Sequence, residues 1–181
     1  MNNIFTDFHE KIGIDNDILQ KYSNLIPNEL TQIWKEYGLG SILQGYLKII
    51  NPEDFVEILN DSYFRSDVAV PIFATGMGDI ITWEENRYLR LVEYRKGIFK
   101  GLSAGFEFFF SDLENNTFLN RYLDAKQYFE AIDIYGEPAY DECFGYTPLL
   151  GLGGSEKTEN LKKVKIREHI QIITEFMGPI Q

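Results

Sequence analysis

The spacing of apolar residues predicts two amphipathic helices in the first third of the chain. Pro27 stands where the first turn of a helix tolerates a missing N–H, and apolar residues then recur three or four positions apart until Gly38. A second helix is expected over residues 51–62, opened by Asn51 and Pro52. Trp34 lies on the apolar stripe of the first helix, so we interpret it as a core residue rather than a binding residue.

From residue 68 onward the pattern changes to short segments rich in β-branched and aromatic residues, separated by glycines and polar turns. This alternation is typical of a meander of antiparallel strands. The expected strands are 68–74, 79–83, 88–94, 98–102 and 106–110.

Beyond Ser111 helical spacing returns, first through Leu123, then over residues 128–134, and finally over about 165–177. Ser111 is read as the cap of the first of these helices. The last helix is expected to bury His169 together with Phe176 or Met177. We place the boundary here, giving modules 1–110 and 111–181, and no Pro-, Ser- or Gly-rich linker separates them. The predicted fold class is α+β: an antiparallel β-sheet flanked by helices, in two closely packed modules.

Composition and charge narrow the classes of function. The chain has 181 residues and is 44% hydrophobic, enough to bury a core. Its 17 basic and 28 acidic residues give a net charge of -11, a field that repels phosphate backbones and attracts basic proteins. We therefore expect no direct nucleic-acid binding. Acidity that serves solubility alone is the competing interpretation of this charge. No apolar run approaches the roughly 20 residues needed to cross a bilayer, so no membrane partner is expected.

The cellular compartment is predicted from two features of the sequence. The first ten residues show no basic stretch followed by an apolar run and a cleavage site, so we expect a cytoplasmic protein. Cys143 is the only cysteine, which excludes an internal disulfide and fits a reducing compartment. We interpret it as a small, semi-buried apolar residue.

Candidate chemistry is sparse. The run from Gly151 to Thr158 resembles a phosphate-binding loop, but Glu156 replaces the glycine that must precede Lys157. His9 and His169 lack the spacing of a zinc site. Adjacent acids usually point apart, which argues against metal or acid–base use of Asp141 with Glu142 or of Glu84 with Glu85. No nucleophile elbow occurs. We predict no catalytic, cofactor-binding or metal-binding residues, and hence no enzyme.

Acidic and aromatic residues at a strand end and in the C-terminal loop are the remaining candidates for a partner-binding surface. Aromatic residues with a polar group are favoured at interfaces, and neighbouring carboxylates suit Lys or Arg of a partner. For the loop residues, closing the core beneath the loop is the competing interpretation. The candidates are Asp79, Trp83, Glu84, Glu85, Tyr140, Asp141, Glu142, Phe144 and Tyr146.

A family resemblance rests on several segments. Residues 140–154, with 163–169 and 177–180, resemble the C-terminal domain of bacterial immunity proteins that neutralise DNases delivered by type VI secretion. Residues 27–38, 45–52 and 71–79 resemble the GAD-like domain that precedes it in that family. The resemblance implies an immunity protein that binds a cognate DNase toxin, a basic nuclease, without catalysis of its own.

Two other classes of function stay open from the sequence. One is a housekeeping or regulatory interaction module of the broader SUKH-like kind, which binds varied partners. The other is a small-molecule enzyme that assembles its site from scattered acids, which a deep polar pocket with converging carboxylates would support.

Overall fold

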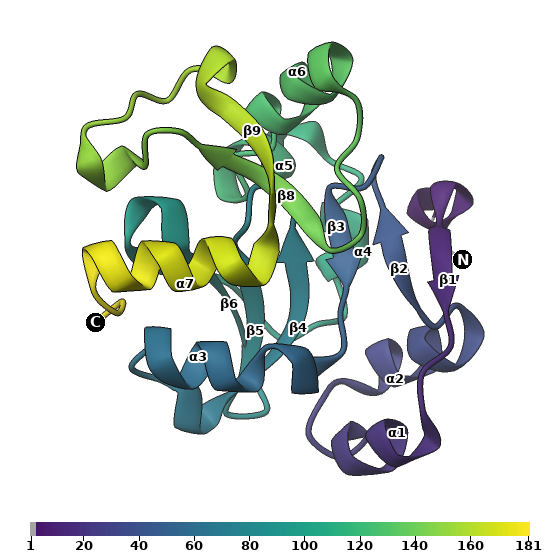
Figure 1. The fold of residues 1–181 in the computed structure, drawn as a ribbon. Helices are drawn as coiled ribbons and strands as arrows, with labels where there is room; N and C mark the ends of the chain where they lie inside the picture. Colours follow the sequence, from purple (N-terminus) through teal and green to yellow (C-terminus); the bar gives the residue numbers. More distant parts are fainter. Residues whose placement is uncertain (1–2) are drawn as a thin grey trace.

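The computed structural model describes residues 3–181 and confirms the α+β class, an antiparallel sheet flanked by helices (Figure 1). The main sheet contains β1 (His9–Ile12), β2 (Leu39–Ile42), β3 (Leu47–Ile49), β4 (Ala69–Thr75), β5 (Ile80–Glu84), β6 (Tyr88–Glu93) and β7 (Ile98–Ala104). A separate hairpin pairs β8 (Glu142–Tyr146) with β9 (Leu161–Lys165). The helices are α1 (Asn16–Tyr22), α2 (Asn28–Glu36), α3 (Val56–Ser62), α4 (Phe109–Asp112), α5 (Asn116–Tyr122), α6 (Lys126–Tyr135) and α7 (Ile166–Met177).

The seven strands of the main sheet follow the order of the chain, and each pairs antiparallel with the next. Helices α1 and α2 connect β1 to β2, and α3 connects β3 to β4. Short 3-10 turns fill several connections: η1 (Asn3–Asp7), η2 (Pro52–Asp54), η3 (Ser66–Val68), η4 (Tyr94–Lys96), η5 (Leu150–Leu152) and η6 (Thr158–Asn160). No helix within residues 3–181 is both long and apolar enough to span a membrane.

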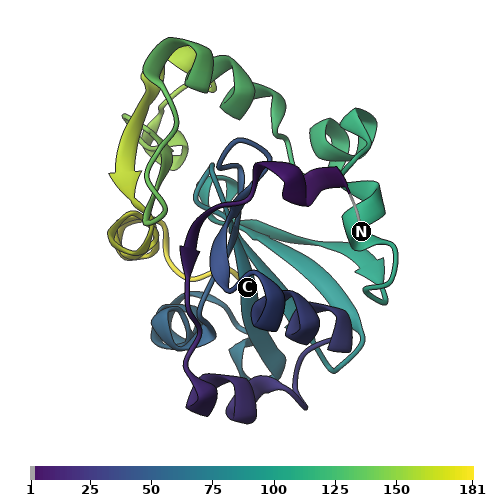
Figure 2. The same ribbon diagram turned by 90° about the vertical axis from the view of Figure 1, so that its right-hand side faces the viewer.

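The two faces of the sheet carry two separate cores. Neighbouring residues of a strand point to opposite faces, so Phe73 and Ile81 enter one core while Ala74 and Ile80 enter the other. The first core contains Trp34 of α2, the aromatic residues around α4, and side chains of α5, α6 and the hairpin. The second lies between the sheet and helices α3 and α7, which run side by side across this face (Figures 1 and 2).

Buried polar side chains join the N-terminal part of the chain (residues 3–110) to the C-terminal part (residues 111–181). The hydroxyl of Tyr46 donates to the Leu123 carbonyl oxygen at 2.6 Å. The hydroxyl of Tyr128 donates to the Gln44 carbonyl oxygen at 2.7 Å. The fully buried Lys48 ammonium donates to the Ala139 carbonyl oxygen at 2.9 Å. Because each bond uses a buried donor, separation of the two parts would leave these groups without partners.

Tyr128 also packs directly on the backbone of the turn between β4 and β5. A Cβ added to Gly76 would lie 2.2 Å from Cε2 of Tyr128, closer than atoms can approach. Gly76 is therefore the residue that admits the tyrosine ring of the C-terminal part. Its N–H donates to the Tyr46 carbonyl oxygen and its carbonyl accepts from the Phe144 N–H, so both parts hold this position.

Several predicted elements need correction. Residues 106–110 do not form a strand: α4 begins at Phe109, because Phe106, Phe109 and Phe110 turn together into the first core. Ser111 lies inside α4 and does not cap the next helix, where Asn115 accepts from the Thr117 N–H. The loop expected around residues 140–146 instead contains β8. The helix expected at 165–177 is confirmed as α7, although Phe176 and Met177 are exposed rather than buried.

Candidate functional site

Five of the nine predicted partner-binding residues lie inside the protein. Asp79, Trp83 and Glu84 sit at the ends of β5, and Phe144 and Tyr146 lie in β8. All five are buried, because β5 is a central strand and β8 is covered by α6 and α7. A partner that binds this conformation contacts none of these five side chains, so the prediction of a surface role is corrected for them.

The other four candidates reach the surface, but not as one patch. Tyr140, Asp141 and Glu142 stand together before and at the start of β8, whereas Glu85 lies in the turn after β5. The Tyr140 hydroxyl donates to the Ile49 carbonyl oxygen at 2.6 Å, which holds this segment against β3. The carboxylate of Asp141 pairs with Lys165 at 2.7 Å.

A cleft of about 360 Å³ lies beside this segment, between η2 and the start of α7. Apolar Ile50, Phe55 and Ile166 form part of its lining. Its charged lining residues are Asp54, Asp141, Glu168, Lys165 and Arg167. The cleft therefore combines an apolar wall with charges of both signs and contains residues from both parts of the chain.

A buried carboxylate forms the centre of one charge cluster, at the end of β5. Glu84 is fully buried and accepts hydrogen bonds from the Tyr63 hydroxyl (2.9 Å), the Thr82 hydroxyl (2.9 Å) and Nε of Arg65 (2.7 Å). Nε of Arg90 lies 2.9 Å from its second oxygen. We call Glu84, Tyr63, Thr82, Arg65 and Arg90 the Glu84 cluster. Arg65 also pairs with the predicted residue Glu85 at 2.8 Å, which fixes that exposed carboxylate.

A buried guanidinium forms the centre of a second cluster, at the other end of β5 and β6. The Arg95 side chain, only 3% exposed, lies 3.0 Å from Asp79, 3.2 Å from Glu93 and 3.1 Å from Asp124. Asp124 belongs to the connection between α5 and α6, so this cluster joins the two parts of the chain. Two lysines complete the Arg95 cluster: Lys96 pairs with Glu93 and Asp124, and Lys100 pairs with Glu93.

The carboxyl groups of the Arg95 cluster respond to burial and to the cations in different ways. Burial raises the pKa of Asp79 to about 6, and the nearby Arg95 only partly opposes this rise. Burial also acts to raise the pKa of Glu93, but Arg95 and Lys100 outweigh it and the pKa is lowered. Asp79 is therefore the member of the cluster whose charge is sensitive to mildly acidic pH.

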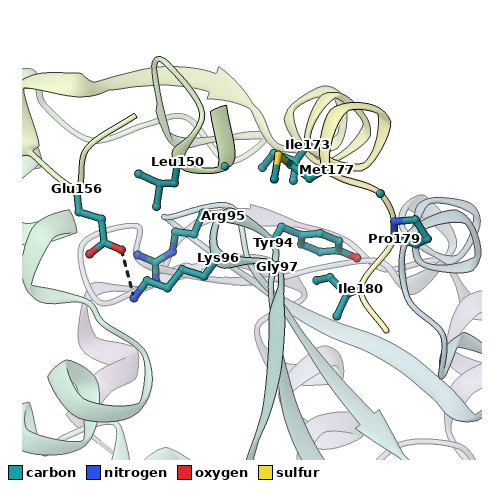
Figure 3. Close-up of a pocket in the computed structure, with 12 residues that line it drawn as sticks. Tyr94, Arg95, Lys96, Gly97, Leu150, Glu156, Ile173, Met177, Pro179 and Ile180 are labelled. Atoms are coloured by element: carbon teal, nitrogen blue, oxygen red, sulfur yellow. Dashed lines mark ion pairs between the residues drawn. The ribbon is translucent and has the colours of Figure 1, made fainter. Parts of the chain in front are cut away.

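Beside the Arg95 cluster lies a cavity of about 470 Å³ between η4, η5 and the end of α7 (Figure 3). Tyr94, Ile173 and Ile180 line its apolar side, and Lys96 pairs with Glu156 at 3.8 Å across its polar side. Within residues 3–181 no group of three or more His, Cys, Asp or Glu side chains is arranged to hold a metal ion.

The two remaining residues of chemical interest serve the interior. Cys143 is fully buried in the second core, and burial raises the pKa of its thiol, which keeps it protonated. His169 is buried beside Gly145, and burial lowers its pKa. No hydrogen bond to the His169 ring is found in the described part of the chain.

Sequence reasoning missed Arg95 as a structural centre. The sequence places Arg95 in a turn, and its partners lie 16 and 29 residues away in positions with no common spacing. The position of Asp79 at the end of a predicted strand was the only local signal, since a carboxylate that enters a core requires a cation or hydrogen-bond donors, and the sequence does not show that Asp79 is buried.

Comparisons with known proteins agree with this architecture. The model of the GAD-like domain family matches residues 2–94, and the model of the family described as T6SS immunity protein Tdi1, C-terminal, matches residues 103–177. A crystal structure of Atu4351 from Agrobacterium tumefaciens is similar at a TM-score of 0.74 and 17% identity, over 94% of this chain and 86% of that chain. At this identity the likeness shows a shared fold. No match was found among curated proteins.

Proposed function

Because the chain belongs to the GAD-like domain family and carries a type VI secretion immunity domain in its C-terminal part, we propose that it is an immunity protein that binds and neutralises a cognate DNase toxin. In this proposal it acts in the cytoplasm by occupying the surface of a basic nuclease, without catalysis. The joint match to both domains, in this order along one chain, carries the proposal.

The charge and interior of the protein support a binding role. A net charge of -11 favours encounter with a cationic partner. The buried charges of the Arg95 cluster are paired within that cluster, and Glu84 is paired within its own cluster. These charges therefore stabilise the fold. The carboxylates free to meet a partner are therefore those on the surface.

Co-expression tests the proposal directly. The DNase effector encoded beside this chain should arrest growth when expressed alone, and growth should return when the wild-type protein is co-expressed. Continued killing despite soluble protein would contradict the proposal. Recovery of a partner other than a toxin in an unbiased pulldown would instead favour a regulatory interaction module.

Electrostatic attraction adds a kinetic expectation. Association with the nuclease should slow by about tenfold or more between low and high salt, while dissociation changes less, because salt screens long-range attraction between exposed charges. Stopped-flow or surface-based binding kinetics at several salt concentrations measure both rates. An association rate independent of salt would remove steering from the proposed mechanism.

A further inference from the structure

Helix α7 carries a second apolar stripe that the fold leaves uncovered. Ile166, Ile170 and Ile173 face the second core and are buried. Ile172 and Phe176, by contrast, are 45% and 61% exposed. Residues four positions apart on a helix are neighbours on its surface, so these two form one continuous apolar ridge. A single exposed apolar residue is ordinary, whereas an apolar ridge framed by charges marks an interaction surface.

Unpaired carboxylates surround this ridge. Glu168 and Glu175 lie on α7 one turn before Ile172 and beside Phe176. Both residues are exposed, and neither forms an ion pair or hydrogen bond within residues 3–181.

Among the other acids of the cleft and cavity described above, Asp141 is paired with Lys165, and Glu156 is paired with Lys96. Glu168, which also lines the cleft, and Glu175 form no such pair. Within α7, Arg167 is the only Lys or Arg residue. The ridge is therefore bordered by carboxylates that no ion pair neutralises.

We propose that the exposed face of α7 centred on Ile172 and Phe176 docks a basic amphipathic segment of a partner protein. Apolar side chains of that segment would cover the ridge, and its Lys or Arg side chains would meet Glu168 and Glu175. This inference rests on the proposed function, in which the partner is the nuclease.

The charge of the face decides between a basic protein and other occupants. Two copies of this chain docked through the same face would place carboxylates against carboxylates, which is unfavourable. An anionic membrane would be repelled for the same reason. A basic amphipathic protein segment can cover the apolar ridge and also pair with the carboxylates around it.

Substitutions on the face and matched substitutions elsewhere test the proposal. The probe is the nuclease domain of the effector encoded beside this chain, inactivated by substitution, and binding is measured by calorimetry. Phe176→Lys should weaken binding by about 30-fold or more, the loss expected for a central aromatic contact. Phe108→Lys, at a phenylalanine that is 69% exposed before α4, should change it by less than about twofold.

A charge-reversed pair gives an independent readout. Glu168→Lys with Glu175→Lys should slow association by about tenfold at low salt. Glu29→Lys with Glu36→Lys on α2 has the same seven-residue spacing and the same change in net charge, and it should slow association much less. Thermal unfolding of each variant shows whether the fold is kept, and exposed positions should leave it nearly unchanged.

The outcomes separate the two proposals. If the wild type protects cells and binds the nuclease, but the α7 variants bind as well as their α2 and Phe108 controls, the docking face is wrong and the proposed function stands. Should the wild type neither bind nor protect, the proposed function fails and the docking face falls with it. Loss confined to the α7 variants supports both.

Discussion

The Glu84 and Arg95 clusters each stabilise a buried charge, and the central charges have opposite signs. Both bury a charge at an end of β5 and β6, but one centre is a carboxylate and the other a guanidinium. Glu84 is surrounded by residues 63–90 of the N-terminal part alone, whereas Arg95 also pairs with Asp124 of the C-terminal part. One cluster stabilises a domain, and the other stabilises the joint between two.

The difference in surroundings determines how strongly the loss of one charged side chain destabilises each cluster. The two arginines that pair with Glu84 have side chains that are 24% exposed, so water can solvate them if the carboxylate is lost. Asp79 and Glu93, in contrast, are buried and depend on Arg95. Removal of one partner from a buried ion pair is costly because the remaining charge has no solvent.

Replacement of Arg95 should therefore have the largest effect. Arg95→Leu leaves Asp79 and Glu93 buried beside an apolar side chain, and we expect it to lower the free energy of unfolding by about 3–5 kcal/mol. Urea denaturation at neutral pH measures the change. Hydrogen exchange should also rise around Asp124 at the joint. Unchanged exchange there would show that Arg95 does not couple the two parts.

Glu84→Gln should cost less, about 2–3 kcal/mol, because hydrogen-bond acceptance from Tyr63 and Thr82 is partly kept while the charge that pairs with Arg65 is lost. The same denaturation experiment applies. Hydrogen exchange around Asp124 should remain at its wild-type level, in contrast to the Arg95 variant. A loss equal to that of Arg95→Leu would remove the distinction between the clusters.

Asp79→Asn should change how the free energy of unfolding depends on pH. The folded pKa of Asp79 is about 6, above its ordinary value of 3.8, so between these values the folded state holds a proton that the unfolded chain has released. This carboxyl thus favours folding at low pH, and the contribution is lost as pH rises through about 6. Relative to wild type, the variant should gain on the order of 2 kcal/mol from about pH 4.5 to pH 7.5. A pH-independent difference between the two proteins would contradict the raised pKa.

Removal of a peripheral cation should have the smallest effect. Arg65→Met and Lys96→Met each leave another cation on the same carboxylate, and both side chains already reach water. We expect each to lower the free energy of unfolding by about 0.5–1 kcal/mol. A double variant should show nearly additive losses, because the two positions belong to separate clusters.

Much of the fold could be predicted from the sequence where one periodicity dominates. The pattern of residues 68–102 correctly predicted strands β4 to β7, and the apolar stripe of α2 correctly predicted that Trp34 is buried. Strand β8 was missed because Gly145 interrupts its apolar run and resembles a turn residue. Residues 106–110 were predicted as a strand but lead into helix α4, since phenylalanines suit a strand and a tight helical turn equally well. The division at residue 110 stays a prediction.

The candidate site was harder to predict than the fold. Asp79 and Glu84 looked like surface acids because sequence gives no sign of the distant Arg95 and Arg65 that allow them to be buried. The four candidates that reach the surface, Glu85, Tyr140, Asp141 and Glu142, remain a prediction.

The contact between Gly76 and Tyr128 has a consequence for how such proteins diversify. A side chain at residue 76 and the tyrosine ring cannot coexist, so the glycine in the turn after β4 and the aromatic residue in α6 must be inherited as a matched pair. Recombination that exchanges one domain between relatives would succeed only when this fit is retained. New specificities would then arise by substitution on exposed surfaces such as that of α7, while the contact between Gly76 and Tyr128 stays fixed.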